Sequence, residues 1–350
     1  MTLSNYMQGR DNNFNLLRIM AALAVLVTHS FALAIGTGAA EPFQGTLGMT
    51  MGSIAVDVFF VTSGFLVTGS LLTRQNAREF LWARFLRVFP ALLVMLLLTV
   101  FVLGPFFTSR SLLSYLTDSQ TYRYLLSCAT LVSGVQYNLP GVFDDNPFKQ
   151  AVNGSLWSLP YEIRMYAILL VGWLALRRIQ PVGGRAFSAA LASAVFAAGL
   201  FLLVRHIKGL PADLFVRLFF MFFSGAALYV LKERIVLAHL YFWLCVLALL
   251  SSAMVSPRVF FVVYLLTIAY AVLYLAYIPS RLVRTYNRVG DYSYGVYIYA
   301  FPVQQSVAAL IPGVSILMLF LISSCITLSL AVLSWHLLER WALSCKTQFV

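Results

Sequence analysis

The feature that most constrains this chain is a series of long stretches without Asp, Glu, Lys or Arg. The longest covers residues 292–338, and Pro312-Gly313 provides a turn that divides it into two segments. A helix needs about 20 apolar residues to cross the hydrocarbon core of a membrane. The sequence therefore predicts an all-α chain of membrane-spanning helices. Further uncharged stretches of this length lie at 19–40, 88–109, 186–204, 235–257 and 259–280.

The amino-acid composition agrees with this prediction and excludes other classes of protein. Of the 350 residues, 61% are hydrophobic and 10% are charged, whereas soluble domains carry about 25% charged residues. A net charge of +12 suggests nucleic acid in a soluble protein. Here we attribute it to basic residues on one side of a membrane, and we expect no nucleic-acid partner. The four cysteines and four histidines are scattered, so no metal site is expected.

Three further apolar segments contain charged residues but are long enough to cross the membrane. We therefore expect about ten transmembrane helices in a single domain over residues 1–350. The first apolar stretch is too long for a signal peptide and is expected to remain as a span. The predicted spans are 15–36, 52–73, 87–107, 156–177, 187–204, 213–231, 236–254, 259–279, 290–310 and 315–338.

Basic residues predict the orientation, because Lys and Arg are enriched on the cytoplasmic side of membrane proteins. Placing the main clusters inside requires both ends of the segment 108–155 to lie outside. The short apolar stretch 121–137 is then expected to be a re-entrant or interfacial helix on the outer side, and both termini are expected to be cytoplasmic. The clusters contain Arg74, Arg78, Arg84 and Arg87; Arg177, Arg178 and Arg185; Lys232 and Arg234; Arg281, Arg284 and Arg288; and Arg340 and Lys346.

Ionisable residues within spans are candidate functional residues, since Arg or Asp at a helix centre costs about 2.5 to 3.5 kcal/mol. Arg18 and His29 are eleven residues apart on the first span, which places them about 16 Å apart on one helix face. Arg18 has the alternative of a cation that extends to the membrane surface. His29 is either a proton acceptor and donor or a hydrogen-bonding partner in helix packing.

The second span contains Asp57 among apolar residues. This side chain is either a functional carboxylate or the buried partner of an Arg or His on another helix. Ser63-Gly64 follows in the same span. Two small residues allow the close approach of either another helix backbone or a slim ligand.

Arg84 and Arg87 share a helix face at the cytoplasmic start of the third span. Two guanidinium groups in this place suit the binding of phosphate groups. The alternative is the ordinary enrichment of basic residues on the cytoplasmic side, where they contact lipid headgroups.

The start of the fourth span combines aromatic rings with charged groups on the predicted outer side. Asn153, Trp157, Tyr161 and Glu162 precede Arg164 within twelve residues. Rings and a carboxylate at a membrane surface suit a sugar ring and its hydroxyls. The alternative is an interfacial aromatic belt with an internal ion pair.

Together these segments resemble the acyltransferase 3 family of bacterial integral-membrane acyltransferases, and the resemblance covers nearly the whole chain. Five segments in order carry it. They are Arg18 and His29 with ten residues between them; Val56-Asp-Val-Phe-Phe-Val-Thr-Ser-Gly-Phe-Leu66; Arg84-Phe-Leu-Arg87 with Val-Phe-Pro90 after it; Leu156-Trp-Ser-Leu-Pro-Tyr-Glu162; and Tyr292-Ser-Tyr-Gly-Val-Tyr-Ile-Tyr-Ala-Phe-Pro302.

Two departures from the family pattern bear on function. Tyr299 and Ala300 stand where the family often has a Trp-His pair before Phe-Pro, so any role of that His is absent here. After Glu162 the chain reads Ile-Arg-Met-Tyr, where the family often has Glu-Gln-Phe-Tyr. The second carboxylate is therefore missing at this place, which bears on the choice of acceptor.

The resemblance implies transfer of an acyl group, usually acetyl, from cytoplasmic acyl-coenzyme A, with acetyl-CoA as the expected donor. The implied acceptor is a hydroxyl of a cell-surface polysaccharide or a lipid-linked oligosaccharide. The implied location is the bacterial cytoplasmic (inner) membrane, where a multi-pass protein also contacts membrane lipids. No metal is implied.

The resemblance also implies roles for individual residues. His29 would be a general base or a transient carrier of the acyl group, and both remain open. Asp57 would orient the imidazole, and Arg18 would contact the donor or steady its channel. The implied donor-binding residues are Arg84, Arg87, Ser63 and Gly64, and the implied acceptor-binding residues are Glu162, Trp157, Tyr161 and Asn153.

Two functions without acyl-transfer chemistry remain as alternatives. One is a transporter or flippase for a lipid-linked sugar, because several spans with scattered polar residues are also typical of transporters. The absence of a visible internal repeat in the sequence counts against it. The other is a membrane scaffold in a polysaccharide-synthesis complex.

Overall fold

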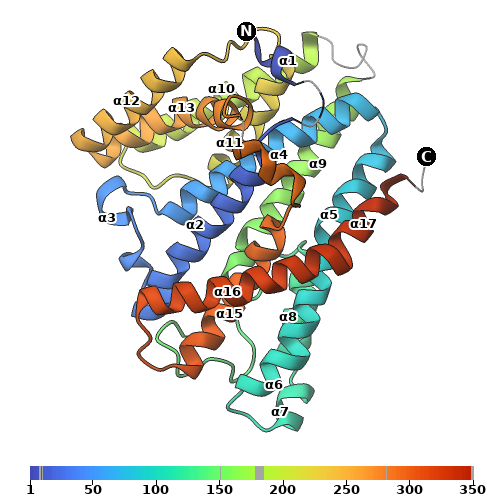
Figure 1. Cartoon of the computed structure of the whole chain (residues 1–350), viewed down its shortest axis with the longest axis vertical. Coiled ribbons are helices and arrows are strands. Elements are labelled where there is room, and N and C mark those ends of the chain that lie inside the picture. Colours follow the sequence, from blue (N-terminus) through green and yellow to red (C-terminus); the bar gives the residue numbers. More distant parts are fainter. Residues whose placement is uncertain (8, 10, 150, 178–184, 281, 348–350) are drawn as a thin grey trace. The chain divides into compact units, whose positions relative to one another are not determined.

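The computed structural model describes residues 1–7, 9, 11–149, 151–177, 185–280 and 282–347 (Figure 1). Within these residues the chain forms helices and no β-strand, with isolated bridges at Thr2–Val236 and Thr108–Val142. The predicted all-α class is confirmed. The helices are α1 Leu3–Tyr6, α2 Phe14–Ile35, α3 Gln44–Leu47, α4 Met51–Arg74, α5 Ala77–Leu98, α6 Gly104–Phe107, α7 Leu112–Thr117, α8 Ser119–Thr130, α9 Leu159–Leu176, α10 Arg185–Ile207, α11 Leu214–Val230, α12 His239–Val255, α13 Pro257–Tyr277, α14 Leu282–Thr285, α15 Ser293–Leu310, α16 Ile316–Ser334 and α17 Arg340–Ser344.

Short helical turns link several of these elements. A π-helical segment at Thr99–Leu103 continues α5 into α6, and another at Trp335–Glu339 continues α16 into α17. Two 3-10 helices, η1 at Gly38–Ala40 and η3 at Gly154–Ser158, follow α2 and precede α9 respectively.

Seven helical segments of the described chain are long and apolar enough to cross a membrane. The other predicted spans correspond to α11 and α12, with 17 residues each, and to α15, with 18. The number of ten spans and the cytoplasmic termini stay predictions. Among the basic clusters, Arg178 and Arg281 lie outside the described residues, as do the side chains of Arg185 and Arg288. The seven segments are Phe14–Ile35, Met51–Arg74, Ala77–Phe107, Gly154–Leu176, Ala186–Ile207, Pro257–Tyr277 and Ile316–Ser344.

Local hydrogen bonding and backbone geometry set two helix ends that the sequence did not predict. The helix that contains the predicted span 87–107 begins at Ala77, where Asn76 Oδ1 accepts hydrogen bonds from the amides of the first turn. The helix predicted over 121–137 is α8, which ends at Thr130. Leu131 follows it in the left-handed conformation with φ of 58°. Residues 132–149 and 151–153 form an irregular connection to η3.

The chain divides into two compact units. Unit 1 comprises Met1–Ala21, Phe43–Phe80 and Arg164–Gly290, and unit 2 comprises Ala22–Pro42, Leu81–Ile163 and Asp291–Val350. The helices α2, α5 and α9 each contribute residues to both units.

In unit 1, α4 and α11 pack with their backbones in direct contact (Figure 1). A Cβ atom at Gly64 would collide with the carbonyl group of Phe222, and one at Gly225 would collide with the carbonyl oxygen of Val61. Each helix therefore supplies a glycine where the other helix approaches, which is the way small residues bring membrane helices together.

A separate hydrophobic cluster in unit 1 connects α1, α2, α4 and α13. The ring of Phe14 stacks on Phe65 with centroids 5.7 Å apart and meets Tyr277 edge-on at 5.5 Å. Leu3 and Leu273 are fully buried in the same cluster.

In unit 2, α15 lies beside α16 (Figure 1). A Cβ atom at Gly295 would lie 2.8 Å from the Cα atom of Ala331, so this contact also requires a glycine. The buried side chains Leu33, Phe301, Val307 and Leu319 connect α2, α15 and α16 in one cluster. This cluster fixes the helices that carry the candidate site described below.

We predict that Gly64→Ala destabilises the protein, because the added methyl group must push the α4 and α11 backbones apart. Overpacking of this kind costs roughly 1–3 kcal/mol. The measurement is the free energy of unfolding of the purified protein in detergent. Gly172→Ala on α9 is the matched control, since a Cβ atom there meets nothing within 4 Å. Equal stability of the two variants would contradict the packing described here.

Candidate active site

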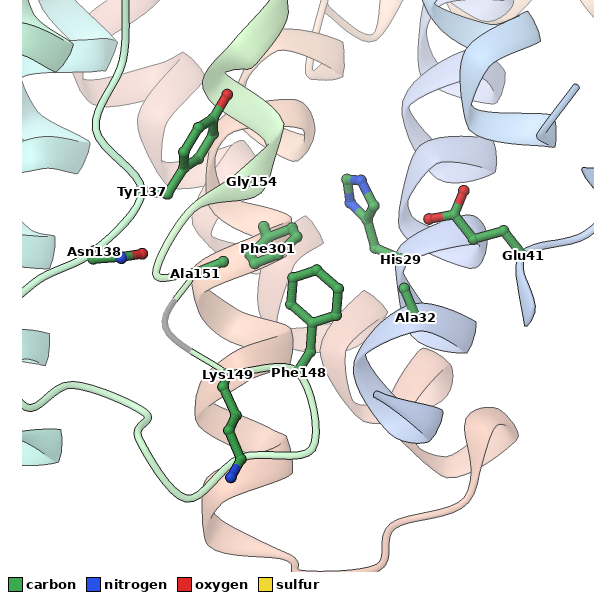
Figure 2. A pocket seen from close by; sticks show the side chains of 10 residues that line it. All are labelled: His29, Ala32, Glu41, Tyr137, Asn138, Phe148, Lys149, Ala151, Gly154 and Phe301. Atoms are coloured by element: carbon green, nitrogen blue, oxygen red, sulfur yellow. The ribbon is translucent and has the colours of Figure 1, made fainter. Parts of the chain in front are cut away.

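A cavity of about 440 Å³ lies in unit 2 between α2, α15 and the connection that precedes η3 (Figure 2). His29 and Ala32 enter it from α2, one turn apart on the same helix face. Phe301 enters from α15. The remaining lining residues are Glu41, Tyr137, Asn138, Phe148, Lys149, Ala151 and Gly154.

His29 is the group with the clearest capacity for chemistry in this cavity. Its ring is half-buried, and Figure 2 shows it extending from α2 toward Gly154 across the cavity. The ring meets Phe301 edge-on, with centroids 5.0 Å apart. Nδ1 is buried and, among the described residues, has no hydrogen-bond partner. A buried imidazole nitrogen without a protein partner can exchange a proton with a bound molecule.

Phe301 forms one wall of the cavity, and its position depends on Gly154. A Cβ atom at Gly154 would lie 2.6 Å from the Phe301 ring, so the start of η3 approaches that ring as closely as glycine allows. Phe148 meets the same ring edge-on from the other side, at 6.3 Å between centroids. The wall facing His29 is thus aromatic and tightly packed.

A hydrogen bond from Asn153 repairs α15 where its helical bonding is interrupted. Pro302 has no amide hydrogen, so the carbonyl oxygen of Ile298 loses its normal helical partner. The Nδ2 of Asn153, which is fully buried, donates to this oxygen at 2.9 Å, and its Oδ1 accepts from the amide of Ser155 at 3.1 Å. These bonds give Asn153 a structural role. Its predicted contact with the acceptor stays a prediction.

The other predicted acceptor residues lie at the start of α9. Trp157 and Tyr161 meet edge-on with ring centroids 6.1 Å apart. Glu162 is half-buried in the first turn of α9. None of the three is among the described residues that line the cavity. The structure thus brings His29 together with Gly154 and Phe301 rather than with these side chains.

Several polar and aromatic residues of the cavity were not found from the sequence, because they lie in connections between helices. Glu41 is the first charged residue after α2, and Figure 2 shows its carboxylate extending toward the His29 side. Tyr137 and Asn138 come from the irregular connection after α8. Burial raises the pKa of Tyr137, so its hydroxyl stays protonated and available as a donor at neutral pH. Lys149 lines the rim, with its amine turned away from His29.

Arg87 lies in a buried ion-pair network of unit 2. Its guanidinium contacts Asp291 at 2.6 Å and Glu339 at 3.8 Å, and only 13% of its side chain is exposed. Ser293 donates to the Asp291 carboxylate at 2.5 Å, and Ser334 donates to that of Glu339 at 3.0 Å. These carboxylates were not found from the sequence, and Glu339 lies at the end of a π-helical segment, an irregularity frequent at functional sites.

Asp57 is the buried partner of an arginine on another helix, which is one of the two interpretations of the sequence. In unit 1 its Oδ2 accepts from Arg217 Nη2 of α11 at 2.5 Å and from the hydroxyl of Tyr264 on α13 at 2.8 Å. Asp57 is 1% exposed. The carboxylate therefore connects α4, α11 and α13, and its catalytic role stays a prediction.

The other residues predicted to bind the donor or to take part in catalysis lie on α2, α4 and α5. Ser63 Oγ lies 3.2 Å from the hydroxyl of Tyr166. The face of Gly64 is occupied by α11, so the structure contains the helix contact rather than a slim ligand at this place. Arg18 and Arg84 are half-buried on α2 and α5. Donor contacts for these residues stay predictions.

Within the described residues, no three His, Cys, Asp or Glu side chains form a group that could hold a metal ion.

Comparison with known proteins identifies the family. The acyltransferase domain model of the acyltransferase 3 family matches residues 11–336, nearly the whole chain. The chain belongs to the acyltransferase 3 family. The resemblance noted in the sequence is confirmed, and the chain is a multi-pass membrane protein.

Among three relatives of the chain, two are named O-acetyltransferases. An O-acetyl transferase of Shigella phage Sf6 is 28% identical over 95% of this chain and 96% of its own length. Nodulation protein 10 of Rhizobium leguminosarum bv. viciae is 28% identical over 99% of this chain and 97% of its own. The peptidoglycan O-acetyltransferase OatA of Listeria monocytogenes is 30% identical over 43% of this chain and 22% of its own. No solved structure matches the chain.

These findings confirm that this member of the acyltransferase 3 family is an enzyme of O-acetyl transfer. The alternatives of a transporter or a scaffold without acyl-transfer chemistry gain no support from them.

We predict that the Asp57–Arg217 pair stabilises unit 1 as a coupled unit. Asp57→Asn alone leaves a buried guanidinium without its counter-charge and should cost about 3–5 kcal/mol. Adding Arg217→Gln should recover part of this loss, because neither charge is then left alone. The measurement is a double-mutant cycle of the unfolding free energy in detergent. Additive losses would contradict the coupling. Recovery of stability without recovery of acetyl transfer would support a further role of Asp57 in the reaction.

We also predict that Pro302→Ala compensates in part for Asn153→Ala. Asn153→Ala leaves the buried carbonyl of Ile298 without a partner and should cost about 1–3 kcal/mol. Pro302→Ala restores an amide hydrogen that can bond the same carbonyl within α15. Thermal unfolding and acetyl-transfer rates of the single and double variants test this. If Asn153 contacts the acceptor, the double variant will regain stability but keep a raised acceptor KM.

Proposed function

We propose that this enzyme transfers an acetyl group from cytoplasmic acetyl-CoA to a hydroxyl of a cell-surface or lipid-linked glycan, with His29 as the reacting side chain. The observation that carries the proposal is the unpartnered, buried Nδ1 of His29 in a cavity large enough for part of a sugar. The proposed location is the bacterial inner membrane, with about ten spans and both termini in the cytoplasm. The α15, α11 and α12 helices would be spans in this topology.

The chemistry of the cavity supports a sugar as the acceptor. Phe148 and Phe301 offer apolar ring surfaces for the faces of a pyranose, whose C–H groups are apolar. Glu41 and Asn138 offer an acceptor and an amide for its hydroxyls. A relative named for peptidoglycan O-acetylation is consistent with a glycan. Glu162, Trp157 and Tyr161 remain proposed contacts for sugar units beyond the cavity.

As a general base, His29 takes the proton of the acceptor hydroxyl while the oxygen of that hydroxyl attacks the carbonyl carbon of the thioester. The carbon–sulfur bond then breaks, the acetyl group stays on the oxygen, and the leaving sulfur takes the proton from the imidazolium. As a covalent carrier, the imidazole nitrogen itself attacks the thioester, releases coenzyme A and then passes the acetyl group to the hydroxyl. Both routes consume one acetyl-CoA and one hydroxyl and give one ester and free coenzyme A.

The donor is proposed to approach from the cytoplasmic side. Arg84 and Arg87 are the proposed contacts of the coenzyme A phosphates, Ser63 is a proposed contact of its arm, and Arg18 is proposed to steady the donor. Gly64 is left out of this proposal, because the α11 backbone fills the space beside it. The ion pairs of Arg87 support a second task for this residue, which is to hold α5 to the ends of α15 and α16 through Asp291 and Glu339.

We predict that His29→Ala abolishes acetyl transfer, with a fall of at least about 100-fold from the loss of proton transfer. The test uses a strain that lacks the gene and is complemented with each variant, and mass spectrometry of its surface glycans. Wild type should restore the mass of one acetyl group per modified unit, and His29→Ala should not.

His206→Ala is the matched control, because this histidine lies in the last turn of α10 in unit 1, where it hydrogen-bonds the carbonyl oxygen of Arg258 and its ring contacts Phe261. It should acetylate like the wild type. Purified wild type given radiolabelled acetyl-CoA and deacetylated glycan should label the glycan. Full acetylation by His29→Ala at a wild-type membrane level would refute the role of His29, and absence of label with wild type would refute the donor.

A further inference from the structure

Two adjacent glutamines on α15 are fully buried, and their side chains bond different segments of unit 2. The Nε2 of Gln304 donates to the carbonyl oxygen of Leu26 at 2.9 Å and to Ser30 Oγ at 2.7 Å. Both partners belong to the turn of α2 that contains His29. Gln304 therefore ties the helix that carries the imidazole to α15.

Gln305 makes the corresponding connection to the opposite wall of the cavity. Its Nε2 donates to the carbonyl oxygens of Phe148 at 2.9 Å and Ala151 at 2.6 Å. Its Oε1 accepts from Asn146 Nδ2 at 2.7 Å, which orients the amide. Phe148 and Ala151 lie outside regular helix, so their carbonyl groups need partners from elsewhere, and the Gln305 side chain supplies both.

We call these two sets of hydrogen bonds, from Gln304 and from Gln305, the tethers. Both glutamines lie on α15 one turn after Phe301, and Phe301 itself lines the cavity. The α15 helix thus supplies one wall of the cavity through Phe301. Its glutamines hold the two other walls, which are the turn of α2 with His29 and the connection at Phe148 and Ala151. A primary amide suits this task, because its two hydrogens can bond two carbonyl or hydroxyl oxygens at once. Because the side-chain oxygen of Gln305 also accepts from Asn146, both the oxygen and the nitrogen of this amide bond the connection that contains Phe148 and Ala151.

We propose that Gln304 and Gln305 are positioning residues with separate tasks in the acetyl-transfer reaction. Gln305 holds the cavity wall at Phe148 and Ala151 and so determines how tightly the acceptor binds. Gln304 holds the His29 turn and so determines the rate of the chemical step. This inference rests on the proposed function, since it assumes that the cavity binds the acceptor and that His29 reacts.

The test is a comparison of steady-state kinetics for Gln304→Met and Gln305→Met, which keep side-chain length and lose the amide. The probe is acetyl-CoA with deacetylated surface polysaccharide from a strain that lacks the gene, varied one at a time. Gln305→Met should raise the KM for the polysaccharide about tenfold with kcat changed little. Gln304→Met should lower kcat about 10- to 100-fold with that KM changed little, because small misplacement of a reacting group is costly. Neither should change the KM for acetyl-CoA.

A merely structural role would lower the active fraction in both variants and move no KM, so this pattern would overturn the inference. The same conclusion follows if both variants change the same parameter. Asn146→Ala and Ser30→Ala are milder variants of the two tethers and keep the test available if a glutamine variant fails to fold. Asn146→Ala should reproduce the KM effect, and Ser30→Ala the kcat effect, each more weakly.

This experiment distinguishes failure of the proposed function from failure of the roles proposed for Gln304 and Gln305. Wild-type activity of His29→Ala would refute the proposed function. An inactive His29→Ala together with unshifted parameters in the glutamine variants would refute the tethers alone.

Discussion

The structure of the candidate site depends on one constraint, which is that a buried polar group in an apolar interior must find a partner within the protein. Pro302 breaks the hydrogen bonding of α15, and the amide of Asn153 restores it from a distant part of the chain. The same bond fixes the start of η3 beside α15. Gly154 can then approach Phe301, and this approach closes one side of the cavity at His29.

The segment from Tyr292 to Gln305, which includes most of α15, supports the site through its contacts with neighbouring elements. Its aromatic residues face the cavity or bond neighbouring elements, as Tyr297 does with Ser158 at 2.6 Å. Gln304 and Gln305 join this segment to α2 and to the connection before η3. Among the described residues the buried Nδ1 of His29 has no hydrogen-bond partner, so it remains available to a molecule bound in the cavity.

Much of the fold could be predicted from the sequence, because uncharged apolar stretches identify spans by length alone. Helix starts set by a capping side chain, such as Asn76 before α5, could not be found by the same rule. The sequence identifies His29 as a candidate functional residue, since an ionisable group in an apolar helix is costly and therefore conspicuous. The partner of Asp57 could be anticipated as an Arg or His, but only the packing of α4 against α11 identifies it as Arg217.

The walls of the cavity could not be predicted, for a physical reason. Glu41, Tyr137, Asn138 and Phe148 lie in connections without periodicity. Phe148 is held by a hydrogen bond from Gln305, which lies 157 positions further along the chain. No local pattern encodes such bonds. Asn153 illustrates the same difficulty, since Trp157 and Tyr161 follow it in the sequence but its hydrogen bonds are to α15 and η3.

The central claim is that the acceptor hydroxyl and the acyl donor meet at the His29 imidazole. A cryo-EM structure of the enzyme with coenzyme A and an acceptor saccharide tests it most directly. We predict a saccharide in the cavity that His29, Phe148 and Phe301 line, with a hydroxyl oxygen within hydrogen-bonding distance of a His29 ring nitrogen. A saccharide bound elsewhere, with this cavity filled only by protein side chains, would contradict it.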